Sequence, residues 1–135
     1  MNQEMLKAIK DFVIEEINPD FIVLFGSQVS GQTHQNSDID IAFYKDNHNI
    51  SAYDIFMLAQ DLADILKIEV DLIDLSSAST VFKAVIFDSG EIIYCQNENI
   101  LDEYRMRTFS MYVRLNAERK EILDAIYESG RVYGY

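Results

Sequence analysis

Apolar side chains recur along this chain at two spacings, and segments of the two kinds alternate. A spacing of three and four residues is typical of a helix with one buried face, and a spacing of two, or a short unbroken apolar run, is typical of a strand. Helices are predicted over residues 3–17, from Ser51 through Ile65, over a short segment with Phe82 to Ile86 between Ser76 or Ser77 and Gly90, and over about 97–129. Strands are predicted over residues 21–25, 38–44, 68–74 and 91–95.

This order of elements predicts the fold class. Strands and helices that alternate in this way are typical of an α/β (α+β) domain with a small mixed sheet. We expect the helices to pack on one side of that sheet, with residues 91–95 at its edge. Residues 1–95 would form the domain, and residues 96–135 a C-terminal helical extension of the same domain. Pro19 is the chain's single proline, so nothing supports a proline-rich linker.

Charge and composition narrow the function classes. The 135 residues carry 23 acidic and 11 basic side chains, a formal net charge of −12. This balance argues against direct nucleic-acid binding, which needs basic surface, and is compatible with a basic protein partner. The single Cys95 excludes an intramolecular disulfide and fits a reducing compartment. Without a signal peptide or an apolar run of membrane-spanning length, we expect a cytoplasmic protein and no membrane contact.

The predicted strand 38–44 carries two acids at alternate positions, Asp38 and Asp40. Residues two apart in a strand project from the same face, about 6.6 Å apart along the chain, so Ile39 and Ile41 would face the other way. A lone pair of this kind is usually a solvated face. It is also the spacing that suits a two-metal site for phosphoryl or nucleotidyl transfer.

A third acid and the absence of cations strengthen the second interpretation. Asp71 lies centrally in strand 68–74, on a face that can be shared with Asp38 and Asp40. No Lys or Arg occurs between residues 11 and 44. Two carboxylates about 4 Å apart repel by about 4 kcal/mol at an effective dielectric near 20, which favours protonation of one of them or binding of a cation. Oxygen-only ligands favour Mg²⁺ or Mn²⁺.

Gly26 and Ser27 end the first predicted strand. A turn after a strand offers free backbone N–H groups to a phosphate, glycine lets the backbone approach closely, and the Ser27 hydroxyl can donate a hydrogen bond. Segment 26–33 nearly matches the P-loop pattern, but Gln32 replaces its lysine. The turn is therefore predicted to hold a nucleoside triphosphate whose α-phosphate an acceptor oxygen attacks as pyrophosphate leaves.

Together these residues resemble the nucleotidyltransferase superfamily related to DNA polymerase β. Its signature is Gly-Ser, a spacer, Asp-x-Asp and a third acid on a later strand, here Gly26-Ser27, Asp38-Ile39-Asp40 and Asp71. The small size resembles the minimal nucleotidyltransferase (MNT) domain proteins, typically antitoxins encoded beside a HEPN-domain ribonuclease toxin. The resemblance covers roughly residues 1–95 and implies the polymerase β-like fold.

The resemblance also implies a reaction and a partner. An MNT antitoxin transfers AMP from ATP to a tyrosine hydroxyl of the HEPN toxin, with which this chain would form a hetero-oligomer. Gly26 and Ser27 would hold the triphosphate, and Asp38 and Asp40 would bind Mg²⁺, as two ions, with Mn²⁺ as an alternative. Asp71 would complete the metal site or help to deprotonate the acceptor.

One departure from the family pattern concerns phosphate binding. Relatives commonly carry arginines just after Gly-Ser, whereas this chain has Gln28, Val29 and Ser30 at those positions. The phosphate contact is therefore missing, or comes from a basic residue elsewhere, such as Lys83, or from the partner.

Two other functions are compatible with the same residues. One is a non-catalytic antitoxin that occludes the toxin. The other is nucleotidyl transfer to a small molecule such as an antibiotic, although residues 96–135 are short for a domain that shapes an acceptor pocket. The toxin itself is excluded, because its R-x4-6-H motif needs an arginine upstream of a histidine, and neither His34 nor His48 has one. Both histidines are expected in exposed loops.

Overall fold

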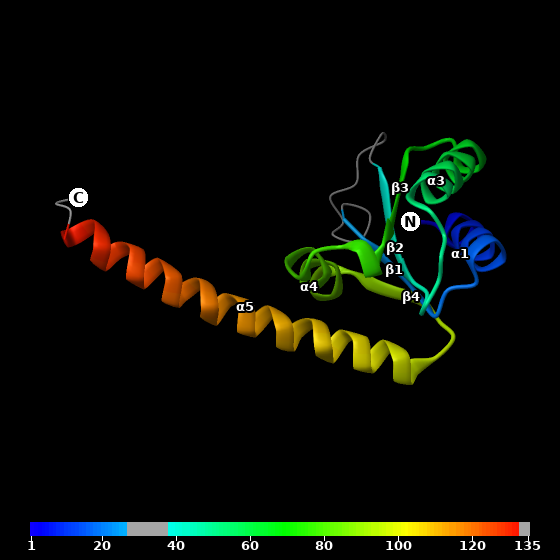
Figure 1. The fold of residues 1–135 in the computed structure, drawn as a ribbon. Coiled ribbons are helices and arrows are strands. Elements are labelled where there is room, and N and C mark those ends of the chain that lie inside the picture. Colours follow the sequence, from blue (N-terminus) through cyan, green and yellow to red (C-terminus); the bar gives the residue numbers. More distant parts are fainter. Residues whose placement is uncertain (27–37, 133–135) are drawn as a thin grey trace.

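Four strands form one mixed sheet in the order β3-β2-β1-β4 in the computed structural model, which describes residues 1–26 and 38–132. The strands are β1 (Phe21–Phe25), β2 (Ile39–Tyr44), β3 (Val70–Asp74) and β4 (Glu91–Cys95). β1 is antiparallel to β2 and β4, whereas β2 and β3 are parallel. The predicted edge position of residues 91–95 is confirmed, and β3 forms the opposite edge within the described ranges (Figure 1).

Helices cover both faces of the sheet, so the expectation that they pack on one side is wrong (Figure 1). The helices are α1 (Gln3–Ile17) and α3 (Ala52–Leu66) on one face, and α4 (Thr80–Ser89) and the first turns of α5 (Glu98–Val132) on the other. The reason lies in β1, all of whose residues are buried. Ile22 and Leu24 join the core under α1 and α3, while Phe21, Val23 and Phe25 join the core under α4 and α5. An unbroken apolar strand needs cover on both faces.

Side-chain caps set where the helices begin. Ser51 caps α3 as predicted, its Oγ accepting a hydrogen bond of 3.0 Å from the N–H three residues later. The predicted cap of α4 is wrong: Ser79, not Ser76 or Ser77, accepts from the N–H three residues on, at 3.1 Å. Ser76 instead donates its N–H to the Asp74 carboxylate at 3.0 Å, and a short 3₁₀ turn, η1 (Leu75–Ser77), precedes α4.

The C-terminal extension, predicted as helical over about 97–129, is one continuous helix of 35 residues. Its first turns pack on the sheet body through Leu101 and Thr108, both almost fully buried. From residue 116 to residue 129 every side chain is exposed, and Figure 1 shows this half reaching beyond the sheet. Within the described ranges, no helix is long and apolar enough to cross a membrane.

Candidate active site

The sheet brings Asp40 and Asp71 together. The two residues occupy facing positions on the parallel strands β2 and β3. Ile39 and Ile41 lie in the core under α1 and α3, so the predicted alternation of β2 is confirmed and Asp40 projects from the opposite face. Asp38 immediately precedes β2 and is half-buried.

Gly26 packs directly against the Asp40 carboxylate. Its φ of 82° is a conformation that residues with a side chain rarely adopt. A Cβ at this position would collide with Oδ2 of Asp40 and lie 3.0 Å from its Cγ. Glycine is therefore required at this position for two reasons: the backbone angle, and the space that the Asp40 carboxylate fills.

The electrostatics of the site follow from three acids without a cation. The pKa of Asp40 is raised from 3.8 to about 6, chiefly because burial disfavours its charged form. The charge of Asp71, a hydrogen bond to Asp71 and the charge of Asp38 add to this effect. Among the described residues, Lys7 forms an ion pair with Asp11 and His48 contacts Asp74, so neither of these basic side chains neutralises the three carboxylates.

The donor set fits a hard divalent cation. The three carboxylates supply only oxygen atoms, and a bound cation would stabilise the charged form of Asp40, which burial and the neighbouring acids disfavour. The three carboxylates are not arranged as a complete coordination site. Within residues 1–26 and 38–132, no cluster of three or more His, Cys, Asp or Glu is placed to hold an ion. Asp40 and Asp71 form the assembled part of the predicted triad, with Asp38 close enough to raise the Asp40 pKa.

Ser27 and Lys83 were the side chains considered for phosphate binding, and the structure places only Lys83. Ser27 and the positions after it lie outside the described residues, as does His34. Lys83, the candidate replacement for the missing arginines, has its ammonium 5.2 Å from the centre of the Tyr104 ring, a cation–π contact.

His48 is not an exposed loop residue, which corrects the expectation. Its side chain is 9% exposed, and its Nε2 lies 2.8 Å from Oδ2 of Asp74, whose side chain is equally buried. The Ile50 N–H donates to Nδ1 of His48 at 3.0 Å, so Nε2 carries the proton and donates to Asp74. This pair ties the loop before α3 to the end of β3, a structural role that loop composition did not indicate.

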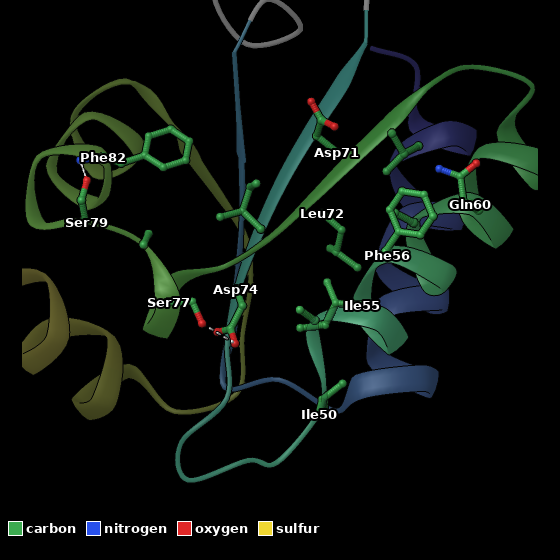
Figure 2. Close-up of a pocket in the computed structure, with 15 residues that line it drawn as sticks. Ile50, Ile55, Phe56, Gln60, Asp71, Leu72, Asp74, Ser77, Ser79 and Phe82 are labelled. Atoms are coloured by element: carbon green, nitrogen blue, oxygen red, sulfur yellow. Dashed lines mark hydrogen bonds between the residues drawn. The ribbon is translucent and has the colours of Figure 1, made fainter.

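A cleft of about 560 Å³ runs along β3, between α3 on one side and the η1–α4 segment on the other. We call it the β3 cleft; Figure 2 shows Asp71 at one end, Phe56 of α3 on one wall and Phe82 of α4 on the other. Sequence reasoning missed it, because the cleft depends on two helices from opposite faces meeting at one sheet edge. The available signal was Phe56, an aromatic residue off the buried stripe of its helix.

Paired acids on adjacent strands, beside a left-handed glycine that ends the neighbouring strand of a small mixed sheet, form the arrangement expected of a nucleotidyltransferase-type site. Comparison of the sequence with known protein families agrees with this class. The family model described as polymerase beta, nucleotidyltransferase matches residues 7–99, and the chain belongs to that family. The predicted resemblance and fold class are thereby confirmed.

Individual similar proteins indicate a narrower group within this family. The protein adenylyltransferase MntA of Shewanella oneidensis is 42% identical over 108 residues, which are 78% of this chain and 74% of that protein. A crystal structure of a toxin–antitoxin with AMP-PNP superposes with a TM-score of 0.80 at 35% identity, over 90% of this chain and 98% of that one. A tri-AMPylated Shewanella oneidensis HEPN toxin in complex with its MNT antitoxin gives 0.78 at 32% identity, over 94% and 99%.

Proposed function

We propose that this protein transfers AMP from ATP to a tyrosine hydroxyl of a HEPN ribonuclease toxin, with which it forms a hetero-oligomeric complex, and thereby acts as its antitoxin. The observation that carries the proposal is the similarity over 94% of the chain to an antitoxin in complex with a tri-AMPylated toxin. The AMP-PNP complex of a similar protein supports ATP as the substrate. The net charge of −12 suits a protein partner better than a nucleic acid.

In this reaction the tyrosine Oη attacks the α-phosphorus of ATP. A bond forms between Oη and the α-phosphorus, the bond from that phosphorus to the oxygen bridging to the β-phosphate breaks, and pyrophosphate leaves with the electron pair. Asp71, which is exposed at the mouth of the β3 cleft, accepts the proton of the tyrosine hydroxyl. Gly26 gives the triphosphate close access to the backbone, and Ser27 donates its hydroxyl to a phosphate oxygen.

Magnesium is part of the proposal. Asp38, Asp40 and Asp71 would hold two Mg²⁺ ions, with Mn²⁺ as a substitute. When bound, the metal supplies positive charge that neutralises the triphosphate and the leaving pyrophosphate. The raised pKa of Asp40 supports this assignment, because burial and the neighbouring acids Asp71 and Asp38 disfavour its charged form, which a bound cation would stabilise.

The proposal extends to domain organisation and location. Residues 1–95 form the catalytic domain and residues 96–135 its helical extension; the family match supports this, since it ends at residue 99, the second residue of α5. A cytoplasmic location is supported by the single Cys95, which stays unpaired within the chain. Fractionation of expressing cells checks the location, and recovery with the membrane pellet would contradict it.

The direct test combines the protein, ATP, Mg²⁺ and the HEPN toxin and weighs the intact toxin by mass spectrometry. We expect a mass increase of one or more adenylyl groups, its loss with EDTA, and its return with Mg²⁺ or Mn²⁺. The double variant Asp38→Asn with Asp40→Asn should bind the toxin but leave its mass unchanged and its ribonuclease active. If the double variant still silences an unmodified toxin, the protein is an occluding antitoxin.

A further inference from the structure

We propose that the β3 cleft binds the toxin segment that carries the acceptor tyrosine, as an extended strand paired to the free edge of β3. The inference rests on the proposed function and adds to it how the acceptor is recognised. It requires a free strand edge, walls that accept a side chain, and a position on the acceptor side of the acids. The described residues meet all three requirements.

The edge of β3 is available for pairing. Within the described ranges, β3 pairs with β2 and has no partner strand on its other side. The Ile39 N–H donates to the Glu69 carbonyl at 2.9 Å, so the odd-numbered residues of this segment direct their backbone groups toward β2. Because these directions alternate along a parallel strand, the N–H and C=O groups of Val70 and Leu72 point away from β2, toward the cleft. Such an edge is a template for an added peptide strand.

The walls of the cleft suit an aromatic side chain. Phe56 on α3 is 59% exposed, and Phe82 on α4 is 38% exposed, although both line the cleft. Phe82 is held in place by an edge contact with Phe25, with ring centres 5.9 Å apart. Figure 2 shows the two rings on opposite sides of β3, with Asp71 beyond them at the mouth. A tyrosine ring can pack against such rings while its hydroxyl reaches a carboxylate.

The cleft lies on the acceptor side of the site rather than the nucleotide side. Gly26 follows β1, Asp40 lies on β2 and Asp71 on β3, so the three residues form a row across the sheet. The proposed triphosphate contact is at the Gly26 end, and the cleft opens at the Asp71 end. In-line displacement requires the nucleophile and the leaving pyrophosphate on opposite sides of the α-phosphorus, and this arrangement provides it. The exposed acid Glu69 next to β3 and the net charge of −12 favour a basic toxin segment.

Backbone hydrogen exchange tests the strand pairing in the complex of the full chain with the HEPN toxin. We expect the amides of Val70 and Leu72 to exchange at least tenfold more slowly in the complex. Those of Asp71 and Ile73 serve as internal controls, because they already bond to β2 and should change little. Unchanged exchange at Val70 and Leu72 in a formed complex would overturn the inference, whether or not AMP is transferred.

A matched pair of aromatic variants tests the cleft wall. Phe56→Ala should raise the KM for the toxin about tenfold and leave the KM for ATP unchanged. Tyr53→Ala is the control, since Tyr53 is an exposed aromatic residue one turn earlier on the same helix but outside the cleft. If Phe56→Ala raises the KM for ATP instead, the cleft is a nucleotide subsite. If both variants behave alike, the cleft does not select the toxin. Failure of the wild-type protein to modify the toxin would refute the proposed function, and hydrogen exchange would still decide the mode of binding.

Discussion

Gly26 packs against Asp40 so closely that the carboxylate of Asp40 occupies the position that a Cβ on residue 26 would need. Since Gly26 ends β1 and Asp40 lies on the adjacent strand β2, this contact joins the proposed phosphate turn to the acids. It also explains why the residue after the first strand must be glycine, independently of any ligand. The consequences for stability and pH dependence can be measured separately.

Gly26→Ala should destabilise the protein by about 2–4 kcal/mol. The left-handed backbone contributes about 1–2 kcal/mol of this, and the collision with Asp40 contributes the rest. Urea unfolding gives the free energy. In an Asp40→Ala background, the same glycine substitution should cost only the backbone part, because the carboxylate is gone. An equal cost in both backgrounds would show that the collision is relieved without strain.

Asp40→Asn should stabilise the metal-free protein at neutral pH. The pKa of Asp40 is raised from 3.8 to about 6, so the folded state holds a proton that the unfolded chain releases earlier. This contribution is fully present below pH 3.8 and is lost as the pH rises through about 6. In EDTA, the asparagine variant should therefore exceed the wild type by about 1–2 kcal/mol at pH 8, less than the full shift implies because the site is partly solvated. The difference should vanish near pH 4.

The control for this pH dependence is Asp61→Asn, which removes an exposed carboxylate on α3. It should shift the free energy of unfolding by less than about 0.5 kcal/mol at either pH. A pH-independent gain at Asp40→Asn would contradict the interpretation that the burial of its charge is what costs stability.

His48→Ala should destabilise the protein by about 2 kcal/mol. The change leaves the buried Asp74 carboxylate without its 2.8 Å partner and the Ile50 N–H without its acceptor. Asn49→Ala, at the exposed neighbouring position, should change the free energy by less than about 0.5 kcal/mol. Urea unfolding of both variants gives the two free energies, and thermal unfolding checks their order. Equal effects would indicate that the loop before α3 is held by its backbone alone.

Truncation after Leu115 should leave the free energy of unfolding within about 1 kcal/mol of the full chain. From residue 116 to residue 129 the side chains of α5 are exposed, so few apolar contacts are lost. Leu101→Ala, which opens a cavity where the same helix packs on the sheet, should cost about 2–4 kcal/mol. A large loss on truncation would mean that the far half of α5 supports the domain.

Local pattern was sufficient for much of the fold. The helix over Gln3–Ile17 and the strands over Phe21–Phe25 and Glu91–Cys95 were predicted with their observed bounds. Each depends on the spacing of apolar residues and on a few end signals, which are properties of neighbouring positions. The unbroken apolar run of β1 also indicates a strand buried on both faces, which is incompatible with the expectation of helices on one side of the sheet.

Within the site, the amino-acid order alone determined that Asp40 projects opposite Ile39 and Ile41, because side chains alternate in any strand. It also indicated Gly26 as a tight turn, and Asp71 as an acid on a compatible face. Only the tertiary structure decided that β3 lies beside β2, which puts Asp71 next to Asp40 and adds to the rise that burial causes in the pKa of Asp40. The burial of His48 and the β3 cleft were decided at the same level. Strand order and helix placement are set by contacts between segments distant in the chain, and no local period encodes them.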